Sequence, residues 1–126
     1  MILVASVTTP RRSRGSVTAE TAVVLPAVVA VLAAALWAVA AVGARLECVD
    51  AARTGARAAS RGESLERVRS DVLAAAPPGS RVVVTRGAEI TRVEVSVTVR
   101  PSWGVSLPGV IVRATAVSAT EPEAEL

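Results

Sequence analysis

The chain has 126 residues, of which 52% are apolar and 20% charged, and its formal net charge is +3. All fourteen basic residues are arginine, and the sequence contains no histidine. Without histidine there is no Ser-His-Asp triad, no HExxH zinc site and no histidine general base. The single cysteine excludes an internal disulfide and a cysteine-cluster metal site. We therefore expect neither an enzyme nor a bound cofactor or metal.

The apolar residues are concentrated in one uncharged run of 24 residues, Thr21 to Ala44. As a helix this run would be about 36 Å long, enough to cross a hydrocarbon core of about 30 Å. A buried core helix is the alternative, but a domain of this size could hardly surround a helix that is apolar on every side. A cleaved secretory signal is disfavoured because its apolar region spans only about 7–15 residues. We predict one transmembrane helix over residues 16–44.

The charges that flank this run predict its orientation. Arg11, Arg12 and Arg14 precede it with no acid before Glu20, whereas the arginines that follow are interleaved with acids. Basic residues are preferentially retained on the cytoplasmic side of a membrane. We therefore expect a plasma-membrane protein with its N-terminus in the cytoplasm and its C-terminal part outside.

An acidic residue, Glu20, stands directly at the entrance of the apolar run. A charged residue at mid-membrane costs about 2.5–3.5 kcal/mol on insertion scales, and less near the interface. Taken alone, Glu20 would be the first turn of a helix in the headgroup region, where the helix dipole favours an anion. It is, however, the fifth residue after Gly15, and Gly15 directly follows the basic cluster at residues 11–14.

This arrangement resembles a class III (prepilin-type) signal, in which a basic leader is cut after glycine and the fifth mature residue is glutamate. The resemblance implies that a prepilin peptidase cuts between Gly15 and Ser16, with the leader arginines on the cytoplasmic side. It also implies an assembly role for Glu20. In an assembled filament, its carboxylate would neutralise the new Ser16 ammonium of a neighbouring subunit, which offsets the cost of two unpaired charges in an apolar environment.

The segment RGSVTAETAVVLP (Arg14 to Pro26), together with DAARTGARAA (Asp50 to Ala59), is similar to TadE-like proteins, the pseudopilins of the tight-adherence (Flp-type) pilus. The resemblance covers about residues 11–62 and implies a membrane-anchored subunit for pilus biogenesis and cell adhesion. The implied partners are the prepilin peptidase, other pilus subunits, the inner-membrane assembly platform and membrane lipid. Thr21 follows Glu20 where a major Flp pilin would carry tyrosine, which favours a minor pilin or pseudopilin.

The helix is expected to continue beyond the membrane, because small residues recur at helical spacing after residue 45. Arg61-Gly62 should end it, Ser64 can cap a second helix, and Pro77-Pro78-Gly79 should end that one. The predicted buried face of the second helix consists of Leu65, Val68, Val72 and Leu73.

Three strands are predicted over residues 81–86, 90–100 and 110–117, because these segments are rich in valine and the middle one alternates cleanly. The predicted fold class is α+β: a long N-terminal transmembrane helix that continues into an outer helix, a short helix, and a small three-stranded antiparallel sheet. We expect Trp103 to cover the sheet and Cys48 to be a small buried residue.

The predicted organisation is a basic leader (1–15), a transmembrane helix (16–44), a small extracytoplasmic domain (45–120) and an acidic tail (121–126). Two functions remain open, a pseudopilin and a single-pass membrane protein whose outer domain binds a partner without polymerising. Removal of the leader would leave eleven arginines against eleven acidic residues. Because the remaining charges are balanced and mixed, nucleic-acid binding is not expected.

Overall fold

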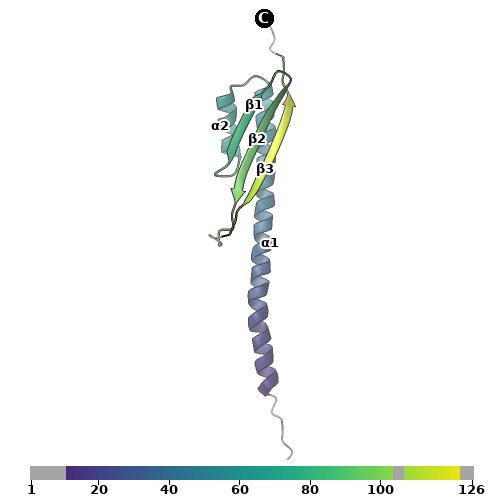
Figure 1. Cartoon of the computed structure of the whole chain (residues 1–126), viewed down its shortest axis with the longest axis vertical. Coiled ribbons are helices and arrows are strands. Elements are labelled where there is room, and N and C mark those ends of the chain that lie inside the picture. The colour runs from purple at the N-terminus through teal and green to yellow at the C-terminus, as the bar shows by residue number, and fades with distance from the viewer. Residues whose placement is uncertain (1–10, 104–106, 123–126) are drawn as a thin grey trace, which may run out of the picture. The chain divides into compact units, whose positions relative to one another are not determined.

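The computed structural model describes residues 11–103 and 107–122, with side chains from residue 15 onward. The element order is two helices followed by three strands (Figure 1). This confirms the predicted α+β fold with a long apolar helix, a short helix and a three-stranded antiparallel sheet. The elements are α1 (Arg11–Ser60), α2 (Leu65–Ala75), β1 (Arg81–Arg86), β2 (Ile90–Val99) and β3 (Val110–Ala119).

The chain divides into two units, one that ends at Leu36 and one that begins at Trp37. In the first unit, every valine and leucine from Val17 to Leu36 is more than half exposed. This part of α1 is therefore apolar on all sides and is not covered by a protein core. Lipid or other apolar helices are the surroundings that suit such a helix.

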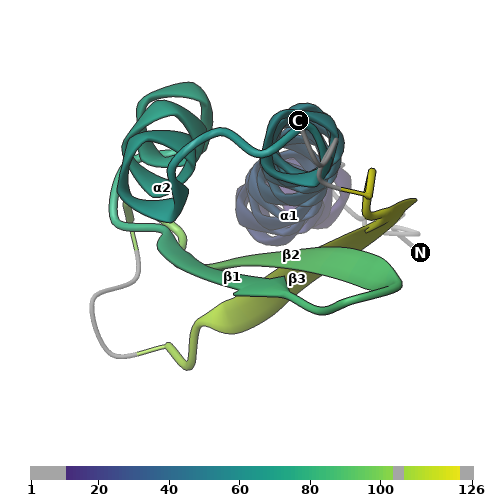
Figure 2. The ribbon, with the colours of Figure 1, turned by 90° about the horizontal axis from the view of Figure 1, so that it is seen from above.

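In the second unit, α2 and the part of α1 from Trp37 onward lie on the same face of the sheet (Figure 2). The strand order is β1-β2-β3, and both neighbouring pairs are antiparallel. β1 has the predicted bounds, and β2 ends one residue earlier than predicted. β3 runs two residues further than predicted because Ser118 and Ala119 pair with Thr91 and Ile90.

The core between the helices and the sheet is made of small side chains. α1 contributes a face of alanines with Cys48, and the sheet contributes valines from all three strands. The helices approach closely at Gly55, where an added Cβ would lie 2.4 Å from Val72 Cγ2 and 3.5 Å from Val93 Cγ1. The buried apolar residues are Cys48, Ala51, Ala52, Ala56, Ala59, Val68, Val72, Ala76, Val82, Val93, Val95, Val97, Val112 and Ala114.

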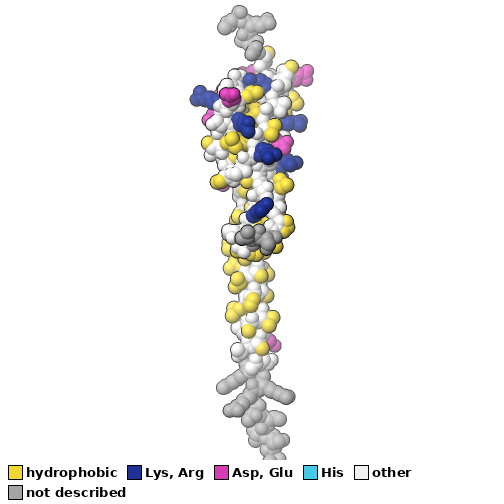
Figure 3. Space-filling model, turned by 60° about the vertical axis from the view of Figure 1, so that its left-hand side comes forward, with side chains coloured by type: hydrophobic (Ala, Val, Ile, Leu, Met, Phe, Trp, Pro, Cys, Tyr) yellow, Lys and Arg dark blue, Asp and Glu magenta, His cyan; other side chains and the backbone are white. Residues whose placement is uncertain are grey.

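Two sequence expectations for the core are wrong. On α2, Val68 and Val72 are buried as predicted, but Leu65 and Leu73 are 37% and 40% exposed. Only Val68 and Val72 belong to the core with the small residues of α1 and the sheet, so two of the four predicted residues are not buried. Trp103 is 60% exposed and does not cover the sheet. The surface of this unit carries interspersed acidic and basic side chains (Figure 3).

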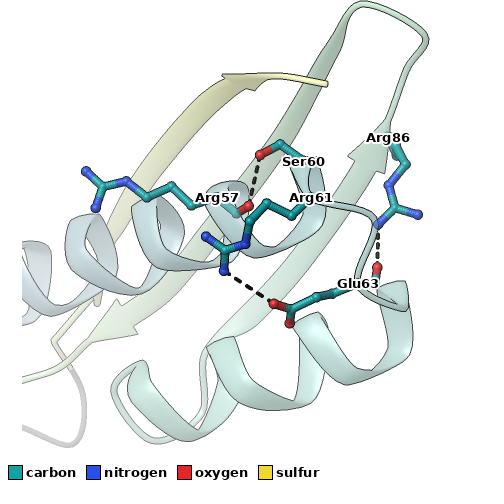
Figure 4. A network of polar contacts seen from close by, with 5 residues as sticks. All are labelled: Arg57, Ser60, Arg61, Glu63 and Arg86. Atoms are coloured by element: carbon teal, nitrogen blue, oxygen red, sulfur yellow. Dashed lines mark hydrogen bonds and ion pairs between the residues drawn. The ribbon is translucent and has the colours of Figure 1, made fainter. Parts of the chain in front are cut away.

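Arg86 of β1 forms hydrogen bonds with the C-terminal end of α1 and with the turn that follows it. Figure 4 shows the bond to Glu63. Arg86 Nε donates to the Ala59 carbonyl at 3.0 Å, and its Nη2 donates to the Glu63 carbonyl. Ser60 Oγ donates to the Arg57 carbonyl at 2.9 Å, while Gly62, at φ +88°, turns the chain out of the helix. The Arg57 and Ala59 carbonyls also accept from Arg61 N–H and Gly62 N–H. Side-chain donors thus add to the backbone bonds that close the end of the helix, so this network has a structural role.

Candidate functional site

The residues of the predicted signal lie in the first turns of α1, because the helix already begins at Arg11. Gly15, Ser16 and Glu20 are all exposed there. The backbone at Arg11, Arg12 and Arg14 is helical, and the side chains of these three arginines lie outside the described part of the structure. The structure thus places the three described signal residues on less than two turns of one helix, and the proposed scissile bond lies within that helix.

No described part of the structure requires glycine at position 15. A Cβ added there would meet no atom within 4 Å, and the backbone does not have a positive φ. A glycine in a helix interior is about 1 kcal/mol less favourable than alanine. The described part of the structure therefore gives no packing reason for glycine at this position.

Glu20 has no cationic partner within the described residues. The ion pairs there are Arg61–Glu63 and Arg113–Glu94, each at 3.3 Å. Glu20 is exposed on the first unit, next to the apolar surface that begins after Thr21. Its carboxylate is therefore available to a cation from another molecule.

A second polar region, which the sequence did not indicate, lies along β3. Two adjoining grooves separate α1 from this strand, with volumes of about 410 and 250 Å³. α1 lines them with three exposed arginines, Arg45, Arg53 and Arg57. The arginines share the groove side because they are spaced by multiples of four residues, which places them on one row of a helix. That spacing is visible in the sequence, but the strand beside it is not.

The remaining titratable candidate is Cys48, which is buried as predicted. Burial, with a smaller contribution from the neighbouring carboxylate of Glu47, raises the pKa of the Cys48 thiol. A raised pKa lowers the thiolate fraction and hence the reactivity of the sulfur. The part of the chain that the structure describes holds no group of three or more cysteine, aspartate or glutamate residues that could bind a metal ion.

One family model matches part of the long helix α1. Residues 15–57 match the family model of TadE-like proteins. The match covers about one third of the chain and lies wholly within α1, from Gly15 to Arg57. No curated protein and no solved structure matches the chain.

Proposed function

Because residues 15–57 form a TadE-like domain, we propose that this protein is a minor pilin or pseudopilin that serves the biogenesis of a tight-adherence pilus. Its partners would be a prepilin peptidase, other pilus subunits and the inner-membrane assembly platform. The observation that carries the proposal is the spacing of Gly15 and Glu20 at the entrance of an uncharged apolar helix.

Membrane anchoring is the first part of the proposal. α1 is long and apolar enough to cross a membrane, and the mean hydropathy of its best 18-residue window is 2.6. The exposed valines and leucines of the first unit would contact lipid, or the helices of other subunits in a filament. The basic residues before the span would keep the N-terminus in the cytoplasm, so the sheet domain would lie outside the plasma membrane.

Processing after Gly15 is the second part. The peptidase must open the first turns of α1 to reach the bond between Gly15 and Ser16. Glycine at this point lowers the cost of leaving the helix and lets the backbone enter a narrow active site. The absence of any packing requirement at Gly15 supports a role in this step.

Assembly is the third part. Cleavage would create an ammonium group on Ser16, and Glu20 of a neighbouring subunit would pair with it. Both groups would otherwise be unpaired in an apolar environment, so pairing would favour one axial register between subunits.

N-terminal sequencing of the protein extracted from membranes tests the proposal directly. We expect the chain to begin at Ser16, and Gly15→Leu to keep the leader. Gly43→Leu is the matched control, because Gly43 is also a helical glycine with no atom within 4 Å of an added Cβ, and it should be processed normally. Glu20→Ala should be processed but should fail to enter pili. An intact leader in the unaltered chain would instead support the alternative, a single-pass binding protein that does not polymerise.

A further inference from the structure

Among the described residues, the outer edge of β3 has no strand paired with it. Gly87 N–H donates to the Ile90 carbonyl at 2.8 Å, and Thr120 N–H donates to the Glu89 carbonyl at 2.9 Å. In an antiparallel pair, backbone hydrogen bonds are made by every second residue of each strand. With the observed register, both bonds require that the odd-numbered residues of β2 bond to the even-numbered residues of β3. The backbone N–H and C=O groups that point away from the sheet therefore belong to Ile111, Arg113, Thr115, Val117 and Ala119.

No backbone hydrogen bond from another described segment reaches this edge. An open edge normally pairs with a further strand or is protected against pairing. Here the edge borders the grooves described above, whose far wall is α1. A strand added to β3 would therefore direct every second side chain towards that helix.

The arginines that α1 contributes to the grooves favour acidic side chains in an added strand. Arg53 and Arg57 are four residues apart, which corresponds to about 6 Å along the helix. Neither has a carboxylate partner among the described residues. Alternate residues of a strand are about 6.6 Å apart, so a segment with two acids separated by one residue would match this pair of arginines.

The chain itself contains such a segment in its acidic tail, residues 121–126, with the sequence EPEAEL. Glu123 and Glu125 are separated by one residue, so both would face α1 if the tail were extended beside β3. The tail of the same copy is poorly placed for this, because Glu121 N–H is bonded to the Ser60 carbonyl at 3.0 Å. Ser60 is the last residue of α1 and lies beyond Arg57, so the chain has already passed the groove at Glu121.

We propose that the acidic tail of a second copy adds to the open edge of β3 as a fourth strand, with Glu123 and Glu125 opposite Arg57 and Arg53. Main-chain hydrogen bonds would supply affinity, and the two ion pairs would set the register. Since tail and edge are different surfaces of the chain, the contact is head-to-tail and can repeat without closing. This contact goes beyond the proposed function, because it links the outer domains and does not depend on cleavage or on Glu20.

Cross-linking between two differently tagged full-length copies in membranes tests this contact. One copy carries Val117→Cys on the edge strand and the other carries Ala124→Cys in the tail, with a short bis-maleimide as the probe. We expect a cross-linked product that carries both tags. The native Cys48 is buried, so unaltered copies should give no such product.

Charge reversal then tests the role of the arginines. Arg53→Glu with Arg57→Glu in the edge copy should lower the yield about tenfold, and Glu123→Arg with Glu125→Arg in the tail copy should restore it. Arg67→Glu with Arg81→Glu, two exposed arginines on α2 and β1, is the matched control and should leave the yield unchanged.

A further chain carries Val117→Cys and Ala124→Cys together, to test for cross-linking within one copy. Three results would overturn the contact: no product between copies, product only within the doubly substituted copy, or product that survives the Arg53 and Arg57 reversal without loss. N-terminal sequencing of the same samples measures leader cleavage independently of cross-linking. Failure of the tail contact is therefore distinguishable from failure of the proposed function.

Discussion

Arg86 of β1 donates from its Nε to the carbonyl of Ala59, 3.0 Å away in the last turn of α1. The two residues are 27 positions apart, and the same guanidinium also bonds the Glu63 carbonyl. One side chain thus joins the end of α1, the turn that follows it and the sheet. Arginine suits this position because its planar fork presents several donors in fixed directions.

Replacement of Arg86 should therefore destabilise the second unit. We expect Arg86→Ala to lower the free energy of unfolding by about 2–3 kcal/mol, because two carbonyls lose a charged donor. Arg86→Lys should recover only part of this loss, since one ammonium cannot reproduce the fork. Urea-dependent protease resistance of the detergent-solubilised chain provides the measurement. Arg81→Ala, an exposed arginine of the same strand, is the control, and equal losses for Arg81 and Arg86 would contradict the prediction.

Gly55 should be intolerant of a side chain. A Cβ at this position would lie 2.4 Å from Val72 Cγ2, and Val72 is itself buried. Gly55→Ala should destabilise the unit by about 1–3 kcal/mol, despite the better helix propensity of alanine. Gly43→Ala on the same helix meets no atom within 4 Å and should be neutral or slightly stabilising. The same protease assay compares them, and a stabilising Gly55→Ala would show that the helices do not approach as closely as described.

The cap of α2 should contribute measurably to stability. Ser64 Oγ accepts a hydrogen bond from Arg67 N–H at 3.2 Å. Loss of such a cap costs about 1 kcal/mol, so Ser64→Ala should lower the unfolding free energy by that amount. Ser70→Ala, at an exposed position within α2, removes the same hydroxyl from a helix interior and should cost nothing. Hydrogen exchange of the α2 amides would localise the effect, which should be strongest in the first turn.

The Cys48 thiol should react slowly while the chain is folded. Burial and Glu47 raise its pKa above the ordinary value of 9.0, so alkylation at pH 8 should be much slower than in urea. Thr115→Cys on the exposed edge strand provides a reactive comparison. The same shift makes the thiolate less favourable in the folded state than in the unfolded state. The unfolding free energy should therefore fall as the pH rises above about 9, and Cys48→Ala should remove this part of the decline. Equal alkylation rates with and without urea would contradict the burial of this residue.

The local elements were predictable because their signals are local. Ser64 and Gly62 mark the boundary between the helices as expected, and β1 has the expected bounds. The pattern that singles out Gly15 and Glu20 is likewise contained in a short stretch of sequence. The roles of these two residues stay predictions. The wrong predictions concern packing. Leu65 and Leu73 have the right spacing for a buried face, but in the folded unit only Val68 and Val72 of α2 belong to the core.

The groove beside β3 was not predictable for a related reason. In the sequence, Arg53 and Arg57 belong to a stretch in which arginines and acids are mixed, a pattern that usually indicates a solvated face. Their placement beside an open strand edge depends on which side of the sheet α1 covers and on which strand ends the sheet. Likewise, no local pattern connects Arg86 to Ala59. The two residues are 27 positions apart, and they meet only because α2 and the turns beside it bring β1 back to the end of α1.

The choice of alanine and valine for the core has an entropic consequence. Every residue in the described hydrophobic core is alanine, valine or the single cysteine. Alanine loses no side-chain rotamer freedom when it is buried, and valine is already restricted at χ1 before folding. A small domain of this kind buries only modest apolar area, yet little of the resulting free energy is offset by the immobilisation of side chains. The stability of the outer domain therefore depends on backbone order and close approach more than on the size of the groups it buries.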